Sequence, residues 1–238
     1  MPNQTIVIDS NRIQQIGPPA QVHIPANAQI VKAEGKFMIP GLWDAHVHLD
    51  SLLGSTPAVS ERLARRVFLP LLVANGITGV RDMGSLGGFE PVLALRRDIS
   101  LGVLVGPRII APGPAFDGTV QHRGPHAVTG ATEGGRAVIA MKEAGADFVK
   151  VMSLVPRDAF FAIADEAKKQ NLSVVGHVPE SVSATEASDA GQRSMEHLLD
   201  ACDGLSFMTI RSFGRARTPR GSSFSFISEE NDHWRTAG

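Results

Sequence analysis

Two histidines separated by one residue close an apolar segment in the first quarter of the chain. His46 and His48 lie at the end of the predicted strand Leu42–His48, and the two-residue period of a strand directs both side chains to one face. Two imidazoles so placed can chelate one divalent ion. Because short motifs match by accident, an isolated His-x-His is more often a pair of polar loop residues. The surrounding sequence must therefore decide between a metal-binding pair and a pair of polar loop residues.

Three more side chains with suitable chemistry occur where later strand-like segments end. His177 and His197 lie at the ends of the fifth and sixth of these segments, and Lys150 lies at the end of the fourth. A lysine in such a position also suits Schiff-base chemistry, as in class I aldolases. The four histidines that accompany Lys150 favour a metal site over that alternative.

These residues belong to a repeated alternation of apolar strands and amphipathic helices that begins at Gly41. The pattern predicts an α/β fold with parallel strands, and in such a barrel the carboxyl ends of the strands meet at the catalytic end. The predicted strands are Leu42–His48, Ile77–Arg81, Arg108–Ala111, Asp147–Met152, Ser173–Val178 and Ser194–Leu198. The predicted helices are Glu61–Asn75, Phe89–Ile99, Thr132–Ala144 (with Thr132 as N-cap), Arg157–Gln170 and Ser183–Ala190.

The block from Pro40 to His48 resembles the opening signature of the amidohydrolase superfamily, Pro-Gly-x-x-Asp-x-His-x-His, with Asp44 in place. Three further strings are similar to the branch related to imidazolonepropionase, which includes the prolidase-like dipeptidases. The resemblance runs from about Ile6 to Gly204. The strings are Ala146–Met152, Val175–Pro179 and Ser194–Leu198.

The resemblance implies a (β/α)8 TIM-type barrel that holds two divalent metal ions. His46 and His48 would bind one ion, His177 and His197 the other, and a carbamate on Lys150 would bridge them. Zinc suits imidazole ligands, and such mixed sites also admit Mn2+, Fe2+ or Co2+. The implied reaction is hydrolysis of a C–N bond in an amide, dipeptide-like or cyclic amide substrate by a metal-bridged hydroxide, with Lys150, His177 and His197 in the catalytic set.

A lysine needs chemical conversion before it can serve in such a site, because an ammonium group is a poor metal ligand. Near two buried cations the neutral amine is favoured, and it can take up CO2 to become an anionic carbamate with one oxygen for each metal. Lys150 would then act as a bridging carboxylate.

One expected group of the family, a carboxylate at the end of the eighth strand, has no counterpart in the predicted strands. The acids beyond His197 are Asp200, Asp203, Glu229, Glu230 and Asp232. The first two follow the sixth strand too closely, and the others lie in an irregular stretch. Two alternatives to a metal-dependent hydrolase therefore stay open: an inactive truncated fragment that at most binds metal, and a Schiff-base lyase that uses Lys150.

The domain organisation follows from the same patterns. We expect residues 1–40 to form a small β-sandwich segment with strands at 5–8, 12–16, 28–32 and 36–39, residues 41–208 to form six of eight barrel units, and residues 209–238 to be a disordered tail. An unclosed barrel leaves open strand edges, which predicts a homo-oligomer or aggregation. The basic cluster Arg211, Arg215, Arg217 and Arg220 is typical of a solvated tail.

Two weaker candidates lie near the same end of the barrel. His122 and His126 occupy a Gly/Pro-rich loop that could contact substrate, although such loops are usually solvent-exposed. Arg81 and Asp82 close the second strand, where we expect a structural ion pair.

Composition limits the remaining functions. The 238 residues carry 23 basic and 24 acidic side chains, for a net charge of −1, which argues against nucleic acid or an anionic membrane as a partner and leaves a small-molecule substrate. Cys202 is the single cysteine, so a disulfide within the chain and a cysteine-built zinc site are excluded. The N-terminal sequence lacks signal-peptide character, and a cytoplasmic location is expected.

Overall fold

The structure is a computed structural model that describes residues 3–10, 12–49, 56–84, 88–118 and 126–197. It divides into two compact units, Met1–Pro40 and Gly41–Gly238, and each is described by itself. The predicted tail, residues 209–238, lies outside the described residues.

The N-terminal unit contains a β-hairpin. Strands β1 (Thr5–Asp9) and β2 (Arg12–Gly17) pair antiparallel and a short 3-10 helix, Pro19–Gln21, follows. The strands predicted at 28–32 and 36–39 are wrong, because those residues form neither strand nor helix. Their apolar side chains stay exposed, as in Val31 (80% exposed) and Phe37 (96%). β-Branched composition favours a strand only where a partner strand completes the hydrogen-bond ladder.

The second unit contains parallel sheets, as the sequence predicted. The first has the order β3-β4-β5 and the second the order β10-β9-β8-β6-β7. Each of the six predicted strands forms. The strands are β3 (Leu42–Val47), β4 (Ile77–Asp82), β5 (Arg108–Ile110), β6 (Phe116–Asp117), β7 (His126–Ala127), β8 (Phe148–Val151), β9 (Ser173–Gly176) and β10 (Gln192–Met195).

Two short strands in the predicted loop, β6 and β7, are a correction to the sequence analysis. Each has two residues, too few for a period of two to show in the sequence. They extend the second sheet beside β8.

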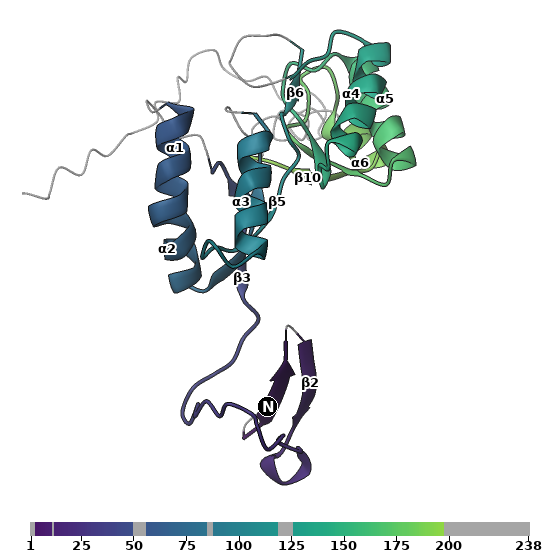
Figure 1. The fold of residues 1–238 in the computed structure, drawn as a ribbon. Coiled ribbons are helices and arrows are strands. Elements are labelled where there is room, and N and C mark those ends of the chain that lie inside the picture. Colours follow the sequence, from purple (N-terminus) through teal and green to yellow (C-terminus); the bar gives the residue numbers. More distant parts are fainter. Residues whose placement is uncertain (1–2, 11, 50–55, 85–87, 119–125, 198–238) are drawn as a thin grey trace, which may run out of the picture. The chain divides into compact units, whose positions relative to one another are not determined.

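Helices connect the longer strands, and Figure 1 shows α4, α5 and α6 gathered beside the second sheet. They are α1 (Pro57–Leu63), which continues through a π-helical turn (Ala64–Phe68) into α2 (Leu69–Ala74), then α3 (Glu90–Ser100), α4 (Ala131–Glu143), α5 (Arg157–Lys169) and α6 (Ala184–Asp189). The predicted cap of α4 is wrong. Gly130 is the N-cap, and the Asp158 carboxylate accepts the Ala131 N–H from a neighbouring helix.

The strands have two different faces. Val149, Val151 and Val174 pack in a cluster with residues of α4 and α5, whereas Phe148 and Val175 pack with Met83, directly after β4, and with Ile110 of β5. The Asp147 N–H also donates to the carbonyl of Ala111, 2.9 Å away, which joins the start of β8 to the end of β5. One face of the strands therefore holds the helices, and the other is an inner face shared by both sheets.

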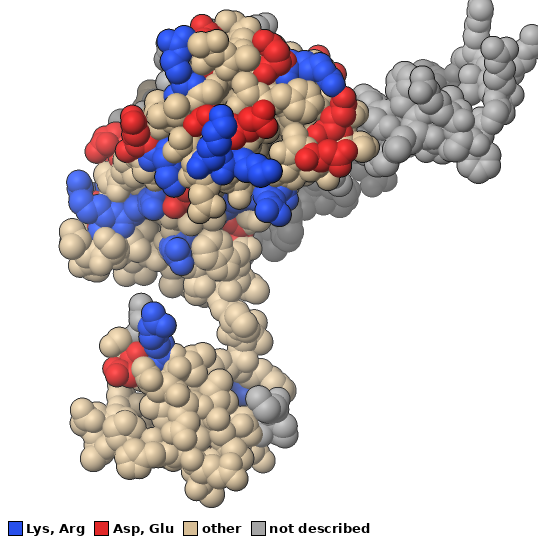
Figure 2. Space-filling model, turned by 90° about the vertical axis from the view of Figure 1, so that its right-hand side faces the viewer, with Lys and Arg blue, Asp and Glu red and all other residues tan. Residues whose placement is uncertain are grey.

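Charges of both signs are intermixed on the face of the molecule shown in Figure 2. Among the described residues, no helix combines the length and the apolar character needed to cross a membrane.

Gly176 lies at the end of β9 with a positive φ of 123°, and a Cβ there would lie 2.2 Å from the Val151 carbonyl oxygen. We expect Gly176→Ala to lower the free energy of unfolding by about 2–4 kcal/mol, from backbone strain plus steric overlap. Urea denaturation followed by circular dichroism measures this. The matched control is Gly135→Ala in α4, where a Cβ meets open space and helix propensity predicts a gain of about 0.5–1 kcal/mol. Equal effects of the two changes would contradict the prediction.

The Glu186 carboxylate lies in the first turn of α6 and takes part in the capping of that helix. Hydrogen bonds from Arg157, and then from Ser183 in a capping box, lower the pKa of Glu186 from 4.5 to about 2. A lowered carboxylate pKa stabilises the fold fully above pH 4.5, and this contribution is lost as the pH falls through about 2.

The Glu186→Gln variant should therefore be less stable than wild type at pH 7, and the difference should shrink as the pH falls below 4.5. Urea midpoints at several pH values measure it. Glu143→Gln, an exposed change in α4, is the control. A difference that stays constant down to pH 3 would overturn the assignment.

Candidate metal centre

The four predicted histidines come together at the carboxyl ends of β3, β9 and β10. The ring centroids lie 5.3 Å apart for His46 and His48, 4.6 Å for His46 and His197, and 5.3 Å for His177 and His197. Ladder hydrogen bonds align the ends of β8, β9 and β10, because the His177 N–H donates to the Val151 carbonyl and the Glu196 N–H donates to the Gly176 carbonyl.

These separations fit metal ligation. Two imidazoles bound to one tetrahedral zinc ion, with Zn–N bonds of about 2.0–2.1 Å, have centroids about 5 Å apart. The three neighbouring pairs match that value. Within the described residues no three His, Cys, Asp or Glu side chains already form a metal-binding group, so the arrangement is one of adjacent pairs.

Hydrogen bonds hold three of the rings through the same nitrogen. The Nδ1 atom of His48 lies 2.8 Å from the carbonyl oxygen of Gly84, that of His46 lies 2.7 Å from Glu196 Oε2, and that of His177 lies 2.8 Å from Ser153 Oγ. A carbonyl or carboxylate oxygen can only accept, so Nδ1 of His48 and His46 carries the proton. In a neutral ring this makes Nε2 the nitrogen with the lone pair that a metal needs.

The backbone around the rings is specialised. The Asp44 carboxylate accepts the backbone N–H of His46 at 3.0 Å. His197 has a positive φ of 64°, which is uncommon outside glycine and is found at strained functional positions. The chain therefore turns sharply where it presents the last histidine.

Lys150 lies in β8 and is almost completely buried, with 3% of its surface exposed. Burial lowers the pKa of Lys150, while the negative charges of Glu196 and Asp82 oppose the shift. Its amine is thus easier to deprotonate than that of a surface lysine, which is the state that carbamate formation requires.

Glu196 and Arg81 were not assigned to the site from sequence, and the structure places both in it. Arg81 Nη2 donates to Glu196 Oε1 at 2.7 Å. The expected ion pair of Arg81 thus forms across strands with Glu196. Burial would raise the pKa of Glu196, but hydrogen bonds from Ser194 and His46 and the charge of Arg81 outweigh it and lower that pKa. The sequence signal that could have assigned Glu196 to the site is its position directly before His197.

The remaining candidates are not placed by the structure. His122 lies outside the described residues, and His126 is described only by its backbone in β7. The acids that follow His197 also lie outside the described residues, so the structure neither supplies nor excludes the expected carboxylate.

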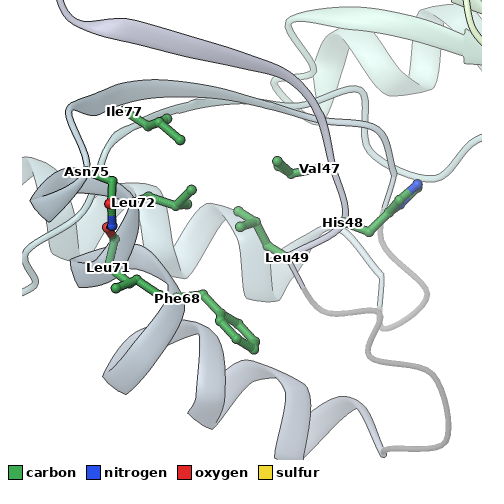
Figure 3. A pocket seen from close by; sticks show the side chains of 8 residues that line it. All are labelled: Val47, His48, Leu49, Phe68, Leu71, Leu72, Asn75 and Ile77. Carbon is green, nitrogen blue, oxygen red and sulfur yellow. The ribbon is translucent and has the colours of Figure 1, made fainter. Parts of the chain in front are cut away.

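A cavity of about 360 Å3 lies between β3 and α2, and His48 is the one member of the histidine cluster among its lining residues. Its lining is mostly apolar, from Val47 and Leu49 on the strand and Phe68, Leu71 and Leu72 on the helical segment (Figure 3). His48 lies at its edge in that view. The cavity has no cluster of ligand side chains comparable with the one at the strand ends.

Comparison with known proteins agrees with this geometry. A family model described as "Amidohydrolase family" matches residues 37–217, which is most of the chain. The chain belongs to the amidohydrolase family. Amidohydrolases have a (β/α)8 barrel, and the six longer strands of the second unit are strands of that barrel.

Individual amidohydrolase relatives are distant. Ochratoxinase from Aspergillus niger is 29% identical over 213 residues, covering 68% of this chain and 43% of that protein. Adenine deaminase from Paracoccus denitrificans is 31% identical over 99 residues, covering 39% of this chain and 17% of that protein. The chain thus spans less than half the length of these curated relatives.

Solved structures support the same fold. A putative prolidase from Bifidobacterium longum has 28% identity and a TM-score of 0.61, over 74% of this chain and 44% of that chain. The A. niger ochratoxinase structure, at 23% identity, has a TM-score of 0.62 over 87% of this chain and 60% of that chain. The second likeness concerns the fold alone.

Proposed function

We propose that this amidohydrolase chain carries the metal centre of a hydrolase acting on C–N bonds. The observation that carries the proposal is the row of four imidazoles at the carboxyl ends of the strands, the end where barrel enzymes do their chemistry. A buried lysine, Lys150, lies in β8, the strand that pairs with β9. Names of the relatives support the bond type, since they include a deaminase and a prolidase.

The ligands divide by strand. His46 at the end of β3 and His48 just after it would hold one divalent ion, and His177 and His197, which follow β9 and β10, would hold the other. Zinc is the first choice because the donors are imidazoles, with Mn2+, Fe2+ and Co2+ as other candidates.

Lys150 would bridge the two ions as a carbamate. Its neutral amine would attack the carbon of CO2, so that an N–C bond forms while the electron pair of one C=O π bond moves to oxygen. The proton lost from nitrogen would pass to water, which leaves a carbamate anion with two oxygens. The buried position and the lowered pKa of Lys150 favour the neutral amine that starts this step.

Bound divalent ions would supply Lewis acidity to polarise the scissile carbonyl and to lower the pKa of a water molecule. The protein's own part would be to orient the ligand rings, and the hydrogen bonds at Nδ1 of His46, His48 and His177 support that role. The group that moves protons is unassigned among the described residues, and the substrate is an amide, dipeptide-like or cyclic amide compound.

The test is metal analysis of the purified chain, combined with an amidase, dipeptidase and deaminase panel. We expect about two divalent ions per chain, loss of turnover with a chelator, and its return on adding metal and bicarbonate. Lys150→Ala should lower the metal content and abolish turnover. Lys168→Ala, which removes a lysine on α5, is the matched control and should change neither.

Each alternative gives a different result. Metal binding without turnover of any substrate indicates a chain that only binds metal. Borohydride trapping of a carbonyl substrate on Lys150, insensitive to chelator, indicates a Schiff-base lyase. If the metal content is nil in wild type and in Lys150→Ala, the two-metal proposal fails.

A further inference from the structure

Glu196 makes contacts that the metal-ligand assignment leaves unexplained. Its Oε2 atom lies 2.7 Å from Nδ1 of His46, and its Oε1 atom accepts hydrogen bonds from Arg81 Nη2 and from Ser194 Oγ, both at 2.7 Å. Only 10% of the Glu196 side chain is exposed. A carboxylate so enclosed, with both oxygens engaged, has one fixed orientation.

Arg81 makes three hydrogen bonds, and one of them goes to that carboxylate. Besides Glu196, it donates from Nε to the Ala45 carbonyl at 2.6 Å and from Nη1 to Ser194 Oγ at 3.1 Å. Ala45 precedes His46 in β3, Arg81 lies in β4, and Ser194 lies in β10 of the other sheet. One guanidinium therefore connects the strand that carries the first pair of histidines with the strand that leads to His197.

We propose that Arg81 and Glu196 are a positioning pair, which holds His46 in the tautomer that presents Nε2 to a metal ion and holds this ring beside His197. The proposal rests on the proposed metal-binding function. Glu196 acts through His46, as the hydrogen-bond partner of a metal-ligand ring, and Arg81 acts through Glu196.

Elementary chemistry explains why a carboxylate serves here. A neutral imidazole that donates Nδ1–H to an anion is confined to one tautomer, and its Nε2 becomes more basic and a better ligand. The anion would be costly to bury alone, and the Arg81 guanidinium supplies the compensating charge with directed donors. Loss of such a partner typically lowers metal affinity about 10–100-fold.

A purely structural role is the competing explanation, because an ion pair across strands could simply join them. The two roles differ in what they change. A structural pair affects the stability of the metal-free protein, whereas a positioning pair also sets the tautomer of His46 and the metal affinity of the folded protein.

The experiment compares Glu196→Ala, Glu196→Gln and a control, Asp98→Asn. Asp98 pairs with Arg65 at 2.6 Å, with side-chain exposures of 29% for Arg65 and 19% for Asp98, and belongs to the helical layer. Zn2+ affinity is measured by competition with a chromophoric chelator, and the visible spectrum of the Co2+ form reports ligand geometry. In the metal-free protein, long-range 1H–15N NMR reads the tautomer of His46 directly.

Glu196→Ala should lower Zn2+ affinity about 10–100-fold, change the Co2+ spectrum and release His46 from the Nδ1–H tautomer. Glu196→Gln keeps an oxygen that can accept from Nδ1 and should recover part of the affinity. Asp98→Asn should leave affinity, spectrum and tautomer as in wild type. If Glu196→Ala does not fold, Glu196→Gln must still lower the affinity and alter the Co2+ spectrum relative to Asp98→Asn.

Failure of this proposal is distinguishable from failure of the proposed function. Unchanged Zn2+ affinity and an unchanged His46 tautomer in both Glu196 variants would overturn the positioning role, even with a sound metal site. Wild type that binds no metal would overturn the metal site and the affinity claim together, while the NMR result would still decide whether Glu196 sets the tautomer.

Discussion

The hydrogen bonds of the Glu196 carboxylate are the central interaction of the candidate site, because they join residues that are far apart in the sequence. His46 lies 150 residues before Glu196 and Arg81 lies 115 residues before it. A buried anion must be neutralised and hydrogen-bonded, and these two side chains do both. The strand ends are therefore held together by polar contacts on their inner face as well as by the packed helices on their outer face.

The two faces of the strands explain how the same sheet contributes both to the packed core and to the candidate site. In β8, Val149 and Val151 pack against the helices, while Phe148 and Lys150 alternate with them on the inner face. The Arg81 guanidinium also lies over the Phe148 ring, 6.0 Å from its centroid. Phe148 and Val175 pack on this face with Met83 and Ile110. Lys150 is almost fully buried in the same sheet and still feels the negative charges of Glu196 and Asp82, so its amine is both buried and near anions.

Sequence alone predicted much of this architecture. The alternation of apolar strands with amphipathic helices located the six longer strands, and the spacing of His46 and His48 with the positions of His177 and His197 identified residues that the structure brings together. The strand–helix alternation can be predicted because it is periodic, and the histidines can be recognised because histidine is a rare residue type. The strands predicted at 28–32 and 36–39 failed because apolar composition does not reveal whether a partner strand exists.

The sequence could not predict which side chains form hydrogen bonds with the histidines of the candidate site. Ser153 and Glu196 are ordinary polar residues whose roles depend on which strand ends become neighbours. The α4 cap failed for a similar reason, since Asp158 of another helix satisfies the Ala131 N–H. Contacts between distant segments depend on which strand ends the fold makes neighbours, and local pattern contains little of that information.

The left-handed backbone of His197 has a consequence for how this site could be redesigned. Few side chains tolerate a positive φ; besides glycine they are chiefly asparagine, aspartate and histidine. Aspartate is the member of that group that offers an anionic oxygen. If His197 is a ligand of the proposed metal site, His197→Asp is therefore the exchange that the backbone tolerates for replacing a nitrogen donor by a charged oxygen, and it would shift the metal preference from zinc toward harder ions such as manganese.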